Sequence, residues 1–125
     1  MMKRRILIVE DQEDLRAILR DLLNASGYET MEAVDGAEGV ARAQSDRPDL
    51  VLMDIQLPVL NGYEAIRRIK ADPGIKSTPV IAVSSYAMKG DEEKARASGC
   101  DSYITKPYSP MQLLSVIRGF LKEQS

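Results

Sequence analysis

Acidic residues follow two apolar runs of this chain, and their carboxylates are the groups best suited to chemistry. Glu10 and Asp11 come directly after residues 5–9, and Asp54 comes directly after residues 49–53. If the two runs form neighbouring strands, three carboxylates converge and repel one another unless a cation or protons intervene. Carboxylate oxygens are hard ligands that bind Mg²⁺ together with water and phosphate oxygens. The pattern therefore predicts a divalent-cation site in which one oxygen of Asp54 stays free as a nucleophile towards phosphorus.

Two more polar residues follow later apolar runs. Ser84 comes after residues 79–83, and Lys106 comes after residues 102–105 and directly before Pro107. An ammonium group would neutralise an incoming phosphoryl group, and a hydroxyl could donate a hydrogen bond to its oxygens. A lone lysine is usually a surface residue, but the place of Lys106 at a strand end facing the acids favours a functional role.

The spacing of apolar residues predicts the elements that position these groups. Strands are expected over 5–9, 28–33, 49–53, 79–83 and 102–105, and helices over 14–25, 37–45, 63–71, 91–98 and 111–121. In the first helix, the residues at helical spacing are Leu15, Ile18, Leu19, Leu22 and Leu23. This alternation indicates an α/β fold, a doubly wound five-stranded parallel sheet with helices on both faces. Sites in such sheets form at the carboxyl ends of the strands, where all five polar residues fall.

Composition excludes several classes of function. The chain has 125 residues, enough for one domain. Its net charge of -2 does not indicate the basic surface that binds nucleic acids. No apolar stretch approaches the roughly 20 residues that span a bilayer, so we expect no membrane partner. The single cysteine, Cys100, fits a reducing compartment, and we expect a cytoplasmic protein. The chain has no histidine and so cannot carry a phosphohistidine itself.

Five segments resemble, in order and spacing, the receiver domain of two-component response regulators. They are Ile8-Val9-Glu10-Asp11, Leu52-Met53-Asp54-Ile55-Gln56-Leu57-Pro58, Asn61-Gly62, Ala82-Val83-Ser84-Ser85-Tyr86-Ala87-Met88-Lys89-Gly90-Asp91 and Tyr103-Ile104-Thr105-Lys106-Pro107. The resemblance covers residues 1–125 as a single receiver domain and implies a flavodoxin-like fold with strand order 2-1-3-4-5. Ser84 replaces the more frequent threonine and Glu10 replaces an aspartate, which keeps the hydroxyl and the charge.

The resemblance implies a role for each site residue. Asp54 would be the phosphoacceptor. The expected Mg²⁺ ligands are Glu10, Asp11, Asp54 and Gln56, the last through its backbone carbonyl. Lys106 would contact the phosphoryl group, and the Lys106-Pro107 peptide would be cis. Ser84 would be the switch hydroxyl, and Tyr103 would turn inward when Ser84 moves. From the bare sequence, Tyr103 is a half-buried strand aromatic, and only the resemblance gives it this role.

The resemblance also implies a function in a two-component system or phosphorelay. A sensor histidine kinase or histidine phosphotransfer protein would supply the phosphoryl group, and altered contacts with a downstream protein target would carry the signal. The chain would be no enzyme beyond its own phosphoryl acceptance and slow self-dephosphorylation, and a monomer or weak dimer. The resemblance is closest to stand-alone receivers of the chemotaxis-regulator and cell-cycle-regulator kind.

Alternative readings remain. The chain could be a receiver excised from a larger regulator or hybrid kinase, or a phosphorylation-independent interaction module, although degenerate receivers lose an acid or the lysine. A phosphatase of the haloacid dehalogenase type needs a second acid two residues after its aspartate, where this chain has Gln56. A flavin or nucleotide binder needs a phosphate cradle after the first strand, where residues 10–14 are mostly acidic.

Overall fold

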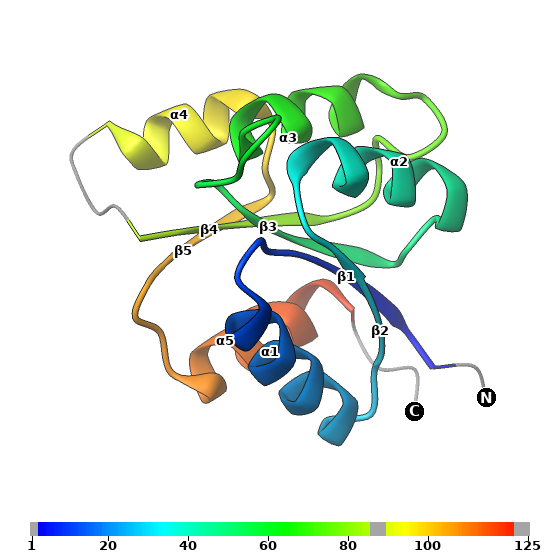
Figure 1. The fold of residues 1–125 in the computed structure, drawn as a ribbon, viewed down its shortest axis with the longest axis vertical. Helices are drawn as coiled ribbons and strands as arrows, with labels where there is room; N and C mark the ends of the chain where they lie inside the picture. The colour runs from blue at the N-terminus through cyan, green and yellow to red at the C-terminus, as the bar shows by residue number, and fades with distance from the viewer. Residues whose placement is uncertain (1–2, 86–89, 122–125) are drawn as a thin grey trace.

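A computed structural model describes residues 3–85 and 90–121 of the chain. In chain order the elements are β1 (Arg5–Val9), α1 (Glu13–Ala25), β2 (Glu29–Ala33), α2 (Gly36–Asp46), β3 (Leu50–Asp54), α3 (Gly62–Ala71), β4 (Val80–Ser84), α4 (Asp91–Ser98), β5 (Ser102–Thr105) and α5 (Pro110–Phe120) (Figure 1). The motif residues Tyr86, Ala87, Met88 and Lys89 lie outside the described part of the chain. No helix among the described residues is long and apolar enough to cross a membrane.

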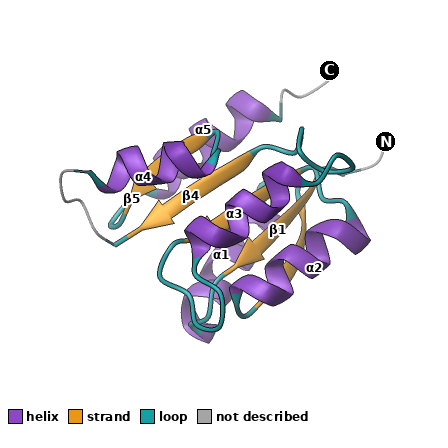
Figure 2. Ribbon diagram, turned by 90° about the horizontal axis from the view of Figure 1, so that it is seen from above, coloured by secondary structure: helices purple, strands orange, loops and turns teal. Residues whose placement is uncertain are grey.

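The strands form one parallel sheet in the order β2-β1-β3-β4-β5, which confirms the predicted fold class and strand order. Helices α1 and α5 cover one face of the sheet, and α2, α3 and α4 cover the other (Figures 1 and 2). Strands β3 and β4 are buried at every position because they lie inside the sheet and both of their faces are covered. Strand β2 lies at the edge and buries only Ala33, in keeping with its polar sequence.

Each face of the sheet has its own apolar core. One core packs β-strand residues such as Val51 and Met53 against α2, α3 and α4. The other packs Ile8 and Leu52 against α1 and α5, where Leu23 and Ile117 are fully buried. Burial of apolar side chains on both faces fixes the register of the strands and hence the positions of the residues at their carboxyl ends.

Two strands extend one residue further than their apolar runs predicted. Asp54 and Ser84 are the last residues of β3 and β4 and do not follow the strands. The ladder continues because Ile55 N–H donates to Val83 O at 2.9 Å and Lys106 N–H donates to Ser84 O at 2.7 Å. The sheet's hydrogen bonds therefore hold the backbone of Ser84 directly and that of Asp54 through its neighbour Ile55.

One apolar residue of α1 is not in the core. Ile18 shares the helical spacing of the buried residues of α1, but 63% of its surface is exposed. Helical geometry turns Ile18 about 100° away from Leu19, which points at the sheet and is buried. The apolar stripe of α1 is thus wider than the face that the sheet covers.

Candidate functional site

Three carboxylates converge at the carboxyl ends of β1 and β3. Each of Glu10, Asp11 and Asp54 offers one oxygen, and these oxygens all lie within 4.8 Å of one another. Glu10 and Asp54 are buried, whereas Asp11 is exposed. Burial, and then the neighbouring Glu10 carboxylate, raises the pKa of Asp11 above its ordinary value. The three negative carboxylates repel one another, and their oxygens are the hard ligands that a divalent cation such as Mg²⁺ prefers. The cluster is therefore suited to hold such a cation.

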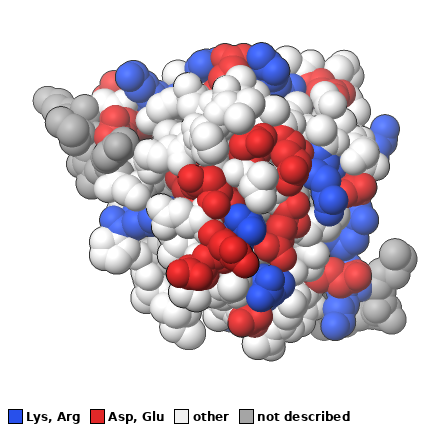
Figure 3. Space-filling model, in the orientation of Figure 1, with Lys and Arg blue, Asp and Glu red and all other residues white. Residues whose placement is uncertain are grey.

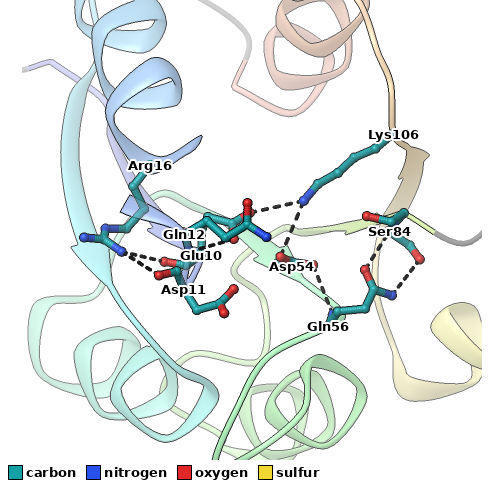
Figure 4. A network of polar contacts seen from close by, with 9 residues as sticks. Glu10, Asp11, Gln12, Arg16, Asp54, Gln56, Ser84 and Lys106 are labelled. Atoms are coloured by element: carbon teal, nitrogen blue, oxygen red, sulfur yellow. Dashed lines mark hydrogen bonds and ion pairs between the residues drawn. The ribbon is translucent and has the colours of Figure 1, made fainter. Parts of the chain in front are cut away.

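Lys106 reaches from the end of β5 to two of these acids. Its Nζ lies 3.2 Å from Glu10 Oε1 and 3.5 Å from Asp54 Oδ2 (Figure 4). Burial alone would lower the pKa of this ammonium, but the charges of Asp54 and Glu10 raise it above its ordinary value. Lys106 is therefore charged at neutral pH and offsets part of the negative charge of the cluster.

Backbone groups hold Asp54 in place. The Gln56 N–H donates to Asp54 Oδ1 at 3.0 Å, and Asp54 Oδ2 faces Lys106. Helix α3 begins close against this strand end. A Cβ on Gly62 would contact Asp54 O and lie 2.6 Å from Ile55 Cα, so only glycine allows this approach. Asn61 caps the same helix, because its side chain accepts from Glu64 N–H.

The side chain of Gln56 joins β3 to the end of β4. Its Nε2 donates to Ser84 Oγ at 3.0 Å, and its Oε1 accepts from Ser85 N–H at 3.1 Å (Figure 4). Ser84 is fully buried. The amide thus holds the Ser84 hydroxyl in one position beside the acidic cluster. Only the Gln56 backbone was expected at the site, because spacing in the sequence does not show where a glutamine side chain points.

Comparison with known proteins gives the family. The response regulator receiver domain family matches residues 6–118. The chain belongs to this family. The polar-differentiation response regulator DivK of Brucella anthropi is 46% identical over 96% of this chain and 98% of its own length. DivK of Brucella ovis is 45% identical over the same shares.

Solved receiver structures share the fold. The receiver domain of a sensor histidine kinase from Pseudomonas aeruginosa PAO1, solved with a magnesium ion coordinated in its active site cleft, is 32% identical. It superposes with a TM-score of 0.90 and covers 98% of this chain and 100% of its own. The chemotaxis protein CheY4 of Vibrio cholerae is 27% identical, with a TM-score of 0.89 over 95% of this chain and 99% of its own. This receiver is thus a phosphoryl-accepting module of two-component signalling, a class that pairs with histidine kinases, and not an enzyme beyond its own phosphoryl chemistry.

The remaining residues expected at the site lie on β5 and in the loop that follows it. Tyr103 is half-buried and packs against the core beneath α2, α3 and α4. It pairs with Ala82 of β4, two residues before Ser84. The Lys106-Pro107 peptide bond of this receiver is cis.

A cavity opens beside the acids of this receiver. It has a volume of about 330 Å³ and lies between α1 and the β5–α5 loop. Its apolar wall is formed by Leu15, Ile18, Leu22, Pro107, Tyr108 and Pro110, and it reaches Glu10, Asp54 and Lys106. Burial raises the pKa of Tyr108, which therefore stays a neutral phenol in this wall.

Arg16 is a further site residue that the sequence analysis missed. Its guanidinium Nη1 donates to Glu10 O at 3.0 Å and to Asp11 O at 3.3 Å (Figure 4). An arginine on the polar face of a helix gives no signal in the sequence, since most such side chains are solvated. Figure 3 shows acidic side chains gathered near the middle of one face of the molecule, with basic side chains among them.

Proposed function

We propose that Asp54 is the phosphoacceptor of this receiver and that Glu10, Asp11, Asp54 and the backbone carbonyl of Gln56 hold Mg²⁺. The convergence of three carboxylate oxygens within 4.8 Å, with a lysine ammonium beside two of the acids, carries this proposal. Hard oxygen donors and a fixed cation are the parts that phosphoryl transfer to a carboxylate requires. Residues 1–125 would act as one receiver domain.

In the transfer step, a carboxylate oxygen of Asp54 forms a bond to phosphorus. The bond from phosphorus to the imidazole nitrogen of the donor's phosphohistidine breaks, and its electron pair leaves on that nitrogen. Bound Mg²⁺ supplies charge neutralisation for the phosphoryl oxygens. Lys106 adds a second positive charge on the side of Asp54 Oδ2, and the Gln56 N–H keeps Asp54 oriented through Oδ1.

Phosphorylated Asp54 would carry more negative charge than the free carboxylate, and this charge would lie beside Ser84. The Ser84 hydroxyl would move to donate a hydrogen bond to a phosphoryl oxygen, which requires it to leave the position that Gln56 Nε2 now holds. Tyr103 lies on the neighbouring strand and would turn inward into the space that Ser84 vacates. The surface formed by α4, β5 and α5 would then change its preferred protein target.

A sensor histidine kinase or histidine phosphotransfer protein would dock over the cavity beside Asp54. Ile18 is 63% exposed on the cavity wall, so a partner helix could bury it while its phosphohistidine reaches the acids. The DivK relatives are polar-differentiation regulators, and we propose a similar role here, as a cytoplasmic monomer or weak dimer that signals through a downstream protein.

The proposal is tested by incubating the protein with Mg²⁺ and acetyl phosphate and measuring its intact mass. We expect a gain of one phosphoryl group that is lost in Asp54→Asn and in EDTA. Glu64→Gln, which changes an exposed carboxylate in α3, is the matched control and should be phosphorylated like the unmodified chain. A phosphoryl group that persists in Asp54→Asn would refute the assignment.

A further inference from the structure

Arg16 reaches back from the first turns of α1 to the loop that carries two acids of the site. Its Nη1 donates to the backbone carbonyls of Glu10, at 3.0 Å, and of Asp11, at 3.3 Å. The bonds go to carbonyl oxygens, so Arg16 occupies neither carboxylate. The contact therefore fixes the backbone from which the two side chains extend, without competing for their charged ends (Figure 4).

Few other contacts hold this loop. Helix α1 has Gln12 at its N-cap position, and that side chain makes no capping hydrogen bond. Glu10 is anchored by its N–H to Ala33 O at 3.1 Å and by its carboxylate, which accepts from Gln12 N–H and from Lys106. Among the described residues, Arg16 is the only side chain that binds the carbonyl of Asp11. The exposed Asp11 thus depends most on this contact.

Glu32 on the edge strand β2 orients the guanidinium. Arg16 Nε lies 3.1 Å from Glu32 Oε1, and both side chains are mostly buried. Arg20, one turn further along α1, pairs with the other oxygen at 3.4 Å. Because the planar guanidinium presents its donors in fixed directions, the Glu32 contact determines where Nη1 points. Lysine at this position could keep the charge but not the double attachment.

We propose that Arg16, oriented by Glu32, is a positioning residue that sets the backbone of Glu10 and Asp11 and thereby the affinity of the acidic cluster for a divalent cation. This inference rests on the proposed function, which places Mg²⁺ at those acids. The charge of Arg16 acts in the opposite direction, since a nearby cation repels Mg²⁺. Positioning and simple electrostatics therefore predict opposite results when Arg16 is neutralised.

The test is isothermal titration calorimetry, in which the full chain is titrated with Mg²⁺ and no phosphodonor is present. It measures the dissociation constant for Mg²⁺. Mutating a residue that orients a metal ligand typically weakens metal binding about 10- to 100-fold. We expect Arg16→Gln, Arg16→Lys and Glu32→Gln each to weaken Mg²⁺ binding about tenfold. The matched control is Arg20→Gln, because Arg20 shares Glu32 but makes no contact with the loop among the described residues. The affinity of Arg20→Gln for Mg²⁺ should lie within about twofold of that of the unmodified chain. This is well below the change expected when a residue that orients a metal ligand is lost.

The outcomes separate the possible explanations. Thermal unfolding in EDTA shows whether each variant is folded. If Arg16→Gln is not folded, Arg16→Lys still tests the inference, because it keeps the positive charge and removes only the double attachment. Folded variants that bind Mg²⁺ as tightly as the unmodified chain would overturn the positioning role, as would tighter binding by Arg16→Gln. An unmodified chain that binds no Mg²⁺ would instead overturn the proposed metal site.

Discussion

Neutralising Asp11 should stabilise the fold when no divalent cation is present. One oxygen of Asp11 lies within 4.8 Å of an oxygen from Glu10 and one from Asp54. At this distance and an effective dielectric constant of about 20, each pair of like charges costs about 3.5 kcal/mol. Lys106 offsets part of this cost, and the exposure of Asp11 to water and salt reduces it further. We expect Asp11→Asn to gain about 1 kcal/mol of unfolding free energy after that discount.

The assay is urea unfolding followed by circular dichroism in EDTA at neutral pH. Asp14→Asn is the matched control, because Asp14 is an exposed acid in the first turn of α1 and outside the cluster. A carboxylate there favours the helix, so the control should lose about 0.3–1 kcal/mol. Adding Mg²⁺ should stabilise the unmodified chain in proportion to occupancy and leave Asp11→Asn nearly unchanged.

The effect of Asp11 should also depend on pH. Burial and the Glu10 carboxylate raise the pKa of Asp11 in the folded state above its ordinary value of 3.8. The folded state thus disfavours the charged form, so the stability contributed by Asp11 is present at low pH and lost as pH rises through the folded pKa. The advantage of Asp11→Asn should grow over that range. If Asp11→Asn is less stable than the unmodified chain in EDTA at neutral pH, the reasoning about repulsion is wrong.

Three further substitutions test other parts of the site. Gln56→Ala removes the amide that holds the Ser84 hydroxyl, so the phosphoryl mimic beryllofluoride should bind about fivefold tighter, the equivalent of one hydrogen bond; equal or weaker binding in calorimetry would contradict this. Gly62→Ala should cost about 1–3 kcal/mol in urea unfolding, because the added Cβ meets the backbone of Asp54 and Ile55; an unchanged midpoint would argue against that close approach. Val59 has a φ of 68° and is 82% exposed, so Val59→Asn should gain about 1 kcal/mol by relieving backbone strain; a loss measured in the same assay would refute the strain.

The sequence predicts the sheet well because its signals are local. Apolar runs such as residues 49–53 and 79–83 predict buried parallel strands. Glycine is a local signal of a helix end, and Gly27 and Gly99, which follow the ends of α1 and α4, have positive φ. The boundaries are less secure, since a ladder hydrogen bond extends β3 to Asp54 and β4 to Ser84. An apolar spacing also cannot show how much of a helix the sheet will cover, and Ile18 shares the spacing of the core residues of α1 yet lies outside the core.

The residues of the site likewise fall into those that the sequence could predict and those that it could not. Acids at strand ends could be predicted to converge, because parallel strands end at one edge of the sheet. The residues that hold them could not. Arg16 donates hydrogen bonds to carbonyl groups of the loop before its helix, and the Gln56 amide donates one to Ser84, 28 positions further along the chain. Neither contact follows from spacing, since both depend on side-chain direction after the fold has formed.

Phosphorylation of this receiver should convert Asp54 to an acyl phosphate. To check this, the protein is treated with Mg²⁺ and acetyl phosphate and reduced with borohydride, and its peptides are sequenced by mass spectrometry. Borohydride converts an aspartyl phosphate to homoserine, so we expect homoserine at position 54 and none when Mg²⁺ is chelated. Reduction at Glu10 or Asp11, or at no residue, would contradict it.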